Sequence, residues 1–511
     1  MNKLIYFTLI LVILSCNSQQ QIQNKEETVA QIQKPNIIFI LADDMGYGDL
    51  KSLNPDSDIP TPNMDKIVNE GIHFTDAHTN SSVCTPTRYG VLTGRYAFRT
   101  RLKKGVLWGY SPSLIEPGRE TVASFLKQNG YNTACVGKWH LGLDWQKIDE
   151  SKVIEDIKNN VPEGFDDNVD YSKPVGGGPS DHGFDYSLII PASLDMSPYL
   201  YVRNGMAVAA PTVYTKGKDQ KIDGRGVFWR QGKMSPGFDF FEVLPSLVDS
   251  ACNYISQQSN EEAPFFLYLP LPAPHTPWMP TEEFGGKSNA GKYGDFVNMV
   301  DAQVGKVMQA VAATGMDDRT LIIVTSDNGS DWKPSDKEAY GHQANYIYKG
   351  RKADIYEAGH RVPFIARWKG EIKAGSSSDE VMCTIDLFGT LAGLLKKSLP
   401  DRVGEDSFNL WPAFTGEVSE QPIREATIHH SLHGIFSIRK GKWKFTPHLG
   451  SGGFSSPATI EPKQGEVPGT LFDMENDPEE QHNLYDQHPE IVEELTALLA
   501  KNKAQGYSRS L

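Results

Sequence analysis

KPNIIFILADDMGYGD, residues 34–49, holds a continuous apolar run from Ile37 to Ala42 that lies between a proline and two adjacent aspartates. A short apolar run of this kind is typical of a strand that is buried on both faces, as strands of parallel sheets are. DRTLIIVTSDNGS, residues 318–330, repeats the form, because the run from Leu321 to Thr325 also precedes a polar cluster. Each stretch therefore predicts a buried strand that ends in polar side chains.

Two further stretches have the same construction. APFFLYLPLPAPHTPW, residues 263–278, ends in a proline-rich loop that carries His275. NTACVGKWHLG, residues 132–142, ends at Lys138 and His140. Both predict a strand whose end presents a titratable side chain.

Helical patterns lie between these predicted strands. They include TVASFLKQNG at 121–130, whose Gly130 suits a helix C-terminus, and the longer pattern at 293–315. Alternation of strand and helix predicts an α/β fold with a doubly wound, mostly parallel sheet. Functional groups in such sheets collect beyond the carboxyl ends of the strands, so we expect the four polar clusters to lie there.

The pattern changes near Arg424. Residues 424–453 contain short alternating segments with turns, which predict a small antiparallel sheet. Residues 488–506 form an amphipathic helical pattern. We therefore expect a catalytic domain at 35–423 and a C-terminal subdomain at 424–511.

The N-terminal stretch MNKLIYFTLILVILSC has one lysine, a short apolar core and the sequence Leu-Ser-Cys. This is typical of a secretory signal, and the apolar run is shorter than the roughly 20 residues of a membrane span. The cysteine indicates a lipoprotein signal at 1–15 with lipidation of Cys16; an ordinary cleaved signal is the alternative. Residues 16–34 are polar and glutamine-rich, which predicts a disordered tether. The expected location is the periplasm or outer membrane, with membrane contact only through the lipid.

Composition excludes several classes of protein. The net charge is −14 and the basic residues are scattered, which argues against a nucleic-acid partner. The four cysteines after Cys16 are far apart in the sequence, without a zinc-binding or disulfide pattern. They are Cys84, Cys135, Cys252 and Cys383.

Two pairs of oxygen donors each follow an apolar run. Asp43 and Asp44 end the first run, and Asp327 and Asn328 end the second. Carboxylate and amide oxygens suit calcium or magnesium rather than a metal that prefers thiolates. The alternative for either pair alone is a turn or a helix cap.

Cys84 lies in SSVCTPTRYGVLTGRY, residues 81–96, a polar and basic setting that is unusual for a buried cysteine. Pro86 favours the first turn of a helix, which would place Cys84 at a helix N-terminus, where anions are stabilised. Arg88, one turn further on, would lie on the same side. A helix cap or an unused thiol is the alternative.

CTPTR fits the Cys-x-Pro-x-Arg pattern of the sulfatases in the alkaline phosphatase superfamily, and LTGRY continues the pattern. IFILADDMGYGDL, GKWHLG, PHTPW, TSDNG and GRKADIYEAGHRVP resemble the other blocks of that family, in family order. The resemblance runs from about Pro35 to the C-terminal helix. It implies an alkaline-phosphatase-like fold, with a large, mostly parallel sheet between helices and a smaller C-terminal antiparallel sheet and helix.

The resemblance also implies a chemistry for the cysteine. In this family a maturase oxidises it to formylglycine, whose hydrate attacks sulfur and then releases sulfate from a sulfo-enzyme. One calcium ion is expected, and the residues that resemble its ligands are Asp43, Asp44, Cys84 in its modified form, Asp327 and Asn328.

The other family roles fall on the remaining polar residues. Arg88 resembles the group that orients the nucleophile, and Lys138 resembles the group that holds the nucleophile and a sulfate oxygen of the substrate. His140 resembles the base that drives sulfate release. His275 and Lys352 resemble the pair that binds sulfate and protonates the leaving group. Ser193 resembles the hydroxyl that contacts the nucleophile. Taken singly, His275 would be a surface residue and Lys352 a solvated charge.

The implied activity is hydrolysis of sulfate esters, with a sulfated carbohydrate as the expected substrate. Algal polymers such as ulvan, carrageenan or fucoidan, and glycosaminoglycans, are the candidates, and Trp108, Trp229 and Trp278 offer aromatic faces for sugar rings. A phosphonate or phosphate ester hydrolase with the same nucleophile is the alternative. A non-enzymatic binding lipoprotein is disfavoured, because every residue of the catalytic motifs is present.

Overall fold

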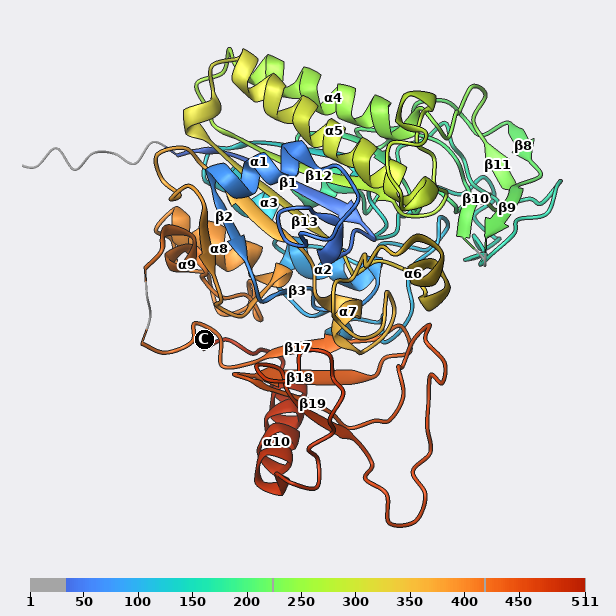
Figure 1. Cartoon of the computed structure of the whole chain (residues 1–511). Helices are drawn as coiled ribbons and strands as arrows, with labels where there is room; N and C mark the ends of the chain where they lie inside the picture. The colour runs from blue at the N-terminus through green and yellow to red at the C-terminus, as the bar shows by residue number, and fades with distance from the viewer. Residues whose placement is uncertain (1–33, 223–224, 418–419, 511) are drawn as a thin grey trace, which may run out of the picture. The chain divides into compact units, whose positions relative to one another are not determined.

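The computed structural model describes residues 34–222, 225–417 and 420–510, and its main feature is a ten-stranded sheet (Figure 1). In spatial order the strands are β15 (Ser376–Ser378), β2 (Ile72–Phe74), β14 (Phe364–Arg367), β13 (Thr320–Ser326), β1 (Asn36–Asp43), β12 (Phe265–Pro274), β4 (Asn132–Lys138), β5 (Tyr186–Ile190), β6 (Val202–Arg203) and β7 (Met206–Ala207). At the centre of the sheet lie five parallel neighbours, β13, β1, β12, β4 and β5.

The four predicted apolar runs form the adjacent strands β13, β1, β12 and β4. Their central position explains why both faces are apolar. In β1, Ile37 and Phe39 belong to one buried core, whereas Ile38 and Ile40 belong to a second core on the opposite face. The sequence prediction of a doubly wound, mostly parallel sheet is confirmed.

Helices cover both faces of this sheet (Figure 1). The core that contains Ile38 also includes apolar side chains of α1 (Pro62–Glu70), α4 (Val243–Gln258) and α5 (Gly291–Ala313). The core that contains Ile37 includes side chains of α2 (Cys84–Thr93), α3 (Val122–Gln128), α8 (Leu387–Leu394) and α9 (Trp411–Thr415). The loops hold α6 (Pro334–Tyr340), α7 (Glu357–His360) and the paired strands β3 (Ala77–His78) with β16 (Met382–Cys383), β8 (Val213–Thr215) with β11 (Gly232–Met234), and β9 (Lys218–Ile222) with β10 (Arg225–Trp229).

A separate antiparallel sheet of four strands follows, as the alternating pattern predicted. It comprises β17 (Thr427–His430), β18 (Phe436–Lys440), β19 (Trp443–Thr446) and β20 (Thr470–Asp473), and α10 (Pro489–Gln505) packs on it. Tyr96 and Phe98 join the same apolar cluster, so the small sheet is packed against the loop that follows α2. Residues Pro35–Leu511 form one compact unit, and the division at residue 424 stays a prediction.

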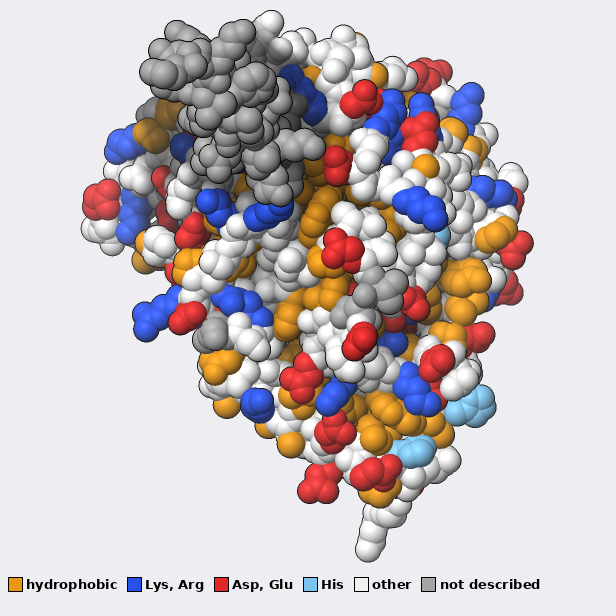
Figure 2. All heavy atoms as spheres, turned by 90° about the vertical axis from the view of Figure 1, so that its left-hand side faces the viewer, with side chains coloured by type: hydrophobic (Ala, Val, Ile, Leu, Met, Phe, Trp, Pro, Cys, Tyr) orange, Lys and Arg blue, Asp and Glu red, His pale blue; other side chains and the backbone are white. Residues whose placement is uncertain are grey.

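The expected signal at 1–15, the lipidation site Cys16 and nearly all of the tether at 16–34 lie outside the described residues. Within the described ranges, no helix combines the length and apolarity that crossing a membrane requires. Figure 2 shows lysine and arginine side chains interspersed with aspartate and glutamate on the face in view.

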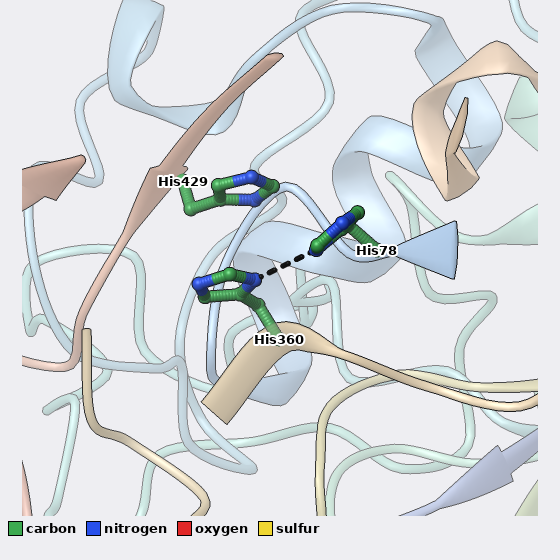
Figure 3. Close-up of side chains that lie close together, drawn as sticks. All are labelled: His78, His360 and His429. Atoms are coloured by element: carbon green, nitrogen blue, oxygen red, sulfur yellow. Dashed lines mark hydrogen bonds between the residues drawn. The ribbon is translucent and has the colours of Figure 1, made fainter. Parts of the chain in front are cut away.

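A stack of buried histidines joins β17 to the main body (Figure 3). His360 of α7 and His429 of β17 lie with ring centroids 3.9 Å apart and ring planes 3° from parallel. His78 of β3 completes the cluster, with its Nδ1 3.0 Å from Nδ1 of His360. The rings of His360 and His429 therefore stack face to face, whereas the ring of His78 is tilted by 37° from that of His360.

The three imidazoles are neutral in the folded protein. Burial lowers the pKa of His78, and it holds the pKa of His429 well below its usual range. For His360, burial and the proximity of His429 and Lys444 hold the pKa well below its usual range. The surrounding charges are Asp76, Glu357, Glu480, Arg361, Arg439 and Lys444.

Stability should therefore fall in mild acid. Below about pH 6.5 a histidine binds a proton in the unfolded chain but stays neutral when it is buried in the folded protein. Each such histidine therefore lowers the free energy of unfolding by about 1.4 kcal/mol for every pH unit of acidification. His429→Gln removes one such group. Between pH 7.5 and 5.5 its unfolding free energy in urea should fall by about 1.4 kcal/mol less than that of the parent protein.

The exposed His482 provides the matched control. His482→Gln should leave the difference between the two pH values as it is in the parent. Equal losses of stability in the parent and in His429→Gln would contradict a buried neutral imidazole at position 429.

Candidate active site

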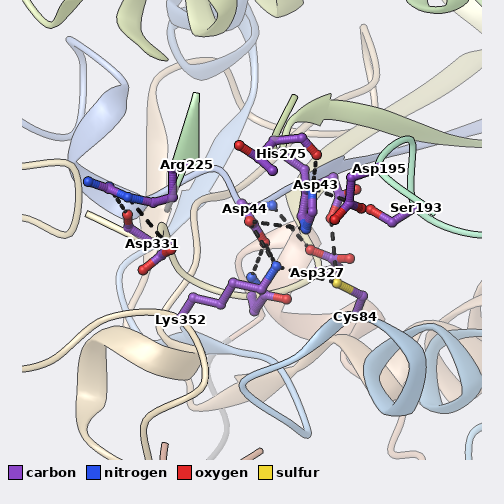
Figure 4. Close-up of polar contacts among 12 residues, drawn as sticks. Asp43, Asp44, Cys84, Ser193, Asp195, Arg225, His275, Asp327, Asp331 and Lys352 are labelled. Carbon is purple, nitrogen blue, oxygen red and sulfur yellow. Dashed lines mark hydrogen bonds and ion pairs between the residues drawn. The ribbon is translucent and has the colours of Figure 1, made fainter. Parts of the chain in front are cut away.

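Polar side chains from neighbouring strands meet at the carboxyl edge of the large sheet (Figure 4). The parallel register pairs Ala42 of β1 with Ser326 of β13, so the next residues along the two strands, Asp43 and Asp327, lie side by side. Asn328 follows and donates through Nδ2 to Oδ1 of Asp44 at 2.6 Å. The structure thus brings together the four oxygen-bearing residues that the sequence singled out.

Cys84 is the first residue of α2, as predicted, and its side chain points into this cluster (Figure 4). Its Sγ lies 3.6 Å from Oδ1 of Asp43 and 3.7 Å from Nζ of Lys352. The preceding Val83 is extended, and the helix ends at Gly94 in the left-handed conformation. Placing the thiol at the helix N-terminus directs the positive end of the helix dipole at the same point.

Arg88, one turn along α2, fixes the helix against two strands. Its Nε and Nη2 donate to Oδ2 of Asp327 at 3.0 and 2.7 Å, and its Nη1 donates to the carbonyl oxygen of Lys138 at 2.9 Å. All of these groups are buried. Charge-assisted bonds of this kind are stronger than neutral ones.

Two lysines complete the charge pairing. Lys138, at the end of β4, contacts Oδ2 of Asp43 at 2.6 Å and Oγ of Ser193 at 3.2 Å. Lys352 contacts Oδ1 of Asp44 at 2.6 Å. Together with Arg88, the two lysines give three buried cations, which face the three buried carboxylates Asp43, Asp44 and Asp327.

His140 has its tautomer set by a carbonyl group. Its Nε2 lies 2.8 Å from the carbonyl oxygen of Leu107, which can only accept, so Nε2 carries the proton. Its Nδ1 has no hydrogen-bond partner among the described residues. Burial, together with Lys138 and Arg88, holds the pKa of His140 well below its usual range. The ring is therefore neutral, with a free lone pair on Nδ1.

His275 follows β12 and lies beside Ser193 (Figure 4). Its Nδ1 is 3.3 Å from Oγ of Ser193 and also contacts the carbonyl oxygen of Thr276. Because a carbonyl oxygen can only accept a hydrogen bond, Nδ1 of His275 carries the hydrogen and donates it. Nε2 faces Asp44, at 3.7 Å from its Oδ2. Among the described residues, the predicted catalytic and metal-binding side chains thus lie within one contact network, except His140, which lines the same cavity as Cys84.

Backbone strain is concentrated at this site. Asp44, His140 and Ala353 have positive φ angles of 67°, 55° and 76°. Such conformations cost about 1–3 kcal/mol each for residues other than glycine, and they persist only where surrounding contacts fix them. Asp44 is fixed by Asn328 and Lys352.

Two of the carboxylates, Asp43 and Asp327, and the Cys84 thiol have pKa values far from their usual ranges. Burial alone would raise the pKa of Asp43, yet Lys138, His275 and Arg88 hold it well below its usual range. Burial and the adjacent Asp43 raise the pKa of Asp327 to about 6. Burial also raises the pKa of the Cys84 thiol to about 12. At neutral pH that thiol is protonated and is a poor nucleophile.

The cluster fits a hard divalent cation. Asp43, Asp44 and Asp327 bring three carboxylates together, and a cation would relieve the repulsion that raises the pKa of Asp327. The Oδ1 atom of Asn328 is buried without a hydrogen-bond partner among the described residues, although its Nδ2 is bonded. Oxygen donors alone favour calcium or magnesium over zinc.

A cavity of about 290 Å³ opens beside Cys84, and His140, His275 and Lys352 line it. Two of the three tryptophans considered for sugar contact, Trp108 and Trp278, also line this cavity. Trp229 instead stacks on Phe240, with ring centroids 4.1 Å apart. A small molecule that enters the cavity therefore meets the charged cluster at one end and aromatic rings at its walls.

Four charged residues of this cavity were missed at the level of sequence. They are Asp195, Arg225, Arg230 and Asp331. Each comes from a loop or a hairpin outside the four apolar runs that predicted strands of the large sheet, so no periodic signal marked it. Only the proximity of Asp195 to Ser193 could have drawn attention to it.

Comparison with known proteins identifies the family. Residues 35–397 match the family described as Sulfatase. An N-acetylgalactosamine-6-O-sulfatase of Bacteroides thetaiotaomicron is 31% identical, over 97% of this chain and 98% of the relative. Arylsulfatase A of Homo sapiens is 30% identical, over 92% of this chain and 88% of the relative. A solved structure described under the metabolism of multiple glycosaminoglycans by Bacteroides thetaiotaomicron has a TM-score of 0.78 at 31% identity, and covers 92% of this chain and 99% of that chain.

The fold and the site together define an ester hydrolase with an alkaline-phosphatase-like fold. Within that class, the chain belongs to the sulfatase family. It is therefore a sulfuric ester hydrolase, and the resemblance that the motifs indicated is confirmed.

Calcium should stabilise the folded protein. A ligand at a hundred times its dissociation constant adds about 2.7 kcal/mol to the free energy of unfolding. We expect calcium to raise the thermal unfolding midpoint of the chelator-treated protein more than zinc does. Asn328→Ala, which removes the unpartnered amide oxygen, should lose most of this rise.

Asn260→Ala, at an exposed position, is the control and should respond to calcium as the parent does. A full calcium response in Asn328→Ala, or a larger rise with zinc than with calcium, would refute the assignment of this cluster to a hard cation.

Proposed function

We propose that this protein hydrolyses sulfate esters on a sulfated carbohydrate, with a nucleophile made from Cys84. The position of Cys84 carries the proposal, because its Sγ lies between Asp43 and Lys352 and the residue lines a cavity. The N-acetylgalactosamine-6-O-sulfatase that this chain resembles over nearly its whole length supports a carbohydrate substrate.

The buried thiol is poorly suited to act as it stands, since its pKa is about 12. Oxidation to formylglycine by a maturase gives an aldehyde that hydrates, and this hydrate supplies one hydroxyl to attack sulfur and a second whose deprotonation releases sulfate. A calcium ion held by Asp43, Asp44, Asp327 and Asn328 would offset the charge of the sulfate.

The chain's own residues then have separate tasks. Arg88 holds Asp327 and the backbone of Lys138 in place, and Lys138 contacts Asp43, the carboxylate beside Cys84. His140 is neutral with a free Nδ1, so it can take the proton that drives sulfate release.

His275 and Lys352 line the cavity near Cys84. Lys352 is a cation, because Asp44 and its other acidic neighbours hold its pKa well above its usual range although burial alone would lower it. A cation here stabilises the sulfate oxygens, and His275, hydrogen-bonded to Ser193, is the group that protonates the leaving alcohol.

The state of Cys84 provides the direct test. In protein from the native host, mass spectrometry of the peptide that contains residue 84 should show the aldehyde instead of the thiol. Cys84→Ala should lower sulfate release by about a thousandfold or more while circular dichroism is unchanged.

Cys252→Ala is the matched control, because Cys252 is a second free cysteine that does not line the cavity. It should retain activity. Fully active protein with an unmodified thiol at position 84, or turnover by Cys84→Ala, would overturn the proposed chemistry.

We also propose that the enzyme is exported and anchored by a lipid on Cys16, in the periplasm or the outer membrane. The short apolar run that ends in Leu-Ser-Cys supports this proposal. Cys16→Ala should move the protein from the membrane fraction to the soluble fraction of the host envelope. An unchanged membrane fraction for Cys16→Ala would exclude lipid anchoring at this residue.

A further inference from the structure

Asp195 lies two residues after Ser193 and lines the cavity beside the candidate sulfate-binding groups (Figure 4). Its side chain is only 5% exposed. Neither the family motifs nor the charge pairing of the catalytic cluster uses this carboxylate. A buried carboxylate aimed at a ligand cavity requires a partner for each of its oxygens.

One of the two oxygens is occupied. Arg230 pairs with Oδ2 of Asp195, and its backbone N–H donates to the carbonyl oxygen of Asp195 at 3.2 Å. The hydroxyl of Tyr199 donates to the same carbonyl at 3.0 Å. Asp195 is therefore held in one position by both its side chain and its backbone.

The other oxygen has no hydrogen-bond partner among the residues that the structure describes. Oδ1 of Asp195 is buried and makes no hydrogen bond to any described residue. The group is ionised, because Arg230 and His275 lower the pKa of Asp195 although burial alone would raise it. A buried charged acceptor without a hydrogen bond lowers the stability of the protein, so the position of Oδ1 beside the cavity indicates that a ligand donates a hydrogen bond to it.

Arg230 also links the carboxylate to an aromatic wall. Its guanidinium carbon lies 5.1 Å from the ring centroid of Trp108 and 5.0 Å from that of Phe228. All three side chains line the cavity. Aromatic faces beside a fixed carboxylate match a sugar ring, which presents C–H groups on one face and hydroxyls at its edge.

We propose that Asp195 determines the substrate by accepting a hydrogen bond from a hydroxyl or amide N–H of the sugar ring that carries the sulfate. This inference rests on the proposed function and adds a substrate class to it. The ring is uncharged apart from its sulfate, since a carboxylate or second sulfate near Oδ1 would be repelled by an ionised group in a low-dielectric site. The cavity of about 290 Å³ lies near the lower end of small-molecule sites, at about 300 Å³, and suits one ring.

Binding to a catalytically inactive protein tests this without relying on maturation. Calorimetry with Cys84→Ala in calcium buffer would compare N-acetylgalactosamine 6-sulfate with a 2-sulfated hexuronic acid. The parent Cys84→Ala protein should prefer the neutral sugar. Adding Asp195→Asn should weaken binding of the neutral sugar and strengthen binding of the uronic acid, so that the preference falls by about tenfold or more.

Asn keeps the shape of Asp and a contact with Arg230, so the fold should persist, and thermal unfolding checks this. Its amide oxygen faces Arg230, which turns its NH₂ toward the cavity and replaces the acceptor by a donor. Asp58→Asn, at an exposed position outside the cavity, is the matched control and should leave the preference as in the parent.

Two outcomes would overturn the inference: no binding of the neutral sugar sulfate by Cys84→Ala, or an equal effect of Asp195→Asn on both ligands. The proposed function fails separately, if the matured enzyme binds sulfated sugars with the expected preference but releases no sulfate from them.

Discussion

The pairing of buried charges at the carboxyl edge of the sheet is the constraint on which the rest of the site depends. Asp43, Asp44 and Asp327 face Arg88, Lys138 and Lys352 in buried positions. Removing one partner from such a pair leaves an uncompensated charge and typically costs about 3–5 kcal/mol. The pairs therefore tie α2, β4 and the loop at Lys352 to the ends of β1 and β13.

The same pairing prepares the site for an anion. With three carboxylates balanced by three cations, a bound divalent ion would leave the cluster positive, and the single negative charge of a sulfate ester would offset part of that charge. Next to the cluster, the cavity is lined by aromatic rings as well as charged groups, with Arg230 over the ring of Trp108 and Arg225 over that of Trp278. The charge of the cluster thus suits a sulfate group, and we propose that Asp195 contacts the sugar ring that carries it.

Much of this could be predicted from the sequence, because the signals are local. An apolar run followed by Asp43 and Asp44 specifies a buried strand with ligands at its end, and the motif around Cys84 specifies a helix start. The histidine stack and the pair of Asp195 with Arg230 could not be predicted, since their members come from separate loops and strands without a shared period. Trp229 was expected to offer a face to a sugar, but its ring stacks on Phe240 instead.

The sequence by itself determined the sheet, the polar residues at the strand ends and the family, because apolar periodicity and motif spacing are properties of contiguous residues. Only the tertiary structure decided which of those residues touch. The register of β1 against β13 sets Asp43 beside Asp327, and the carbonyl of Leu107 sets the tautomer of His140. The tertiary structure also leaves one oxygen of Asp195 without a hydrogen-bond partner among the described residues, because such partners depend on how distant segments pack.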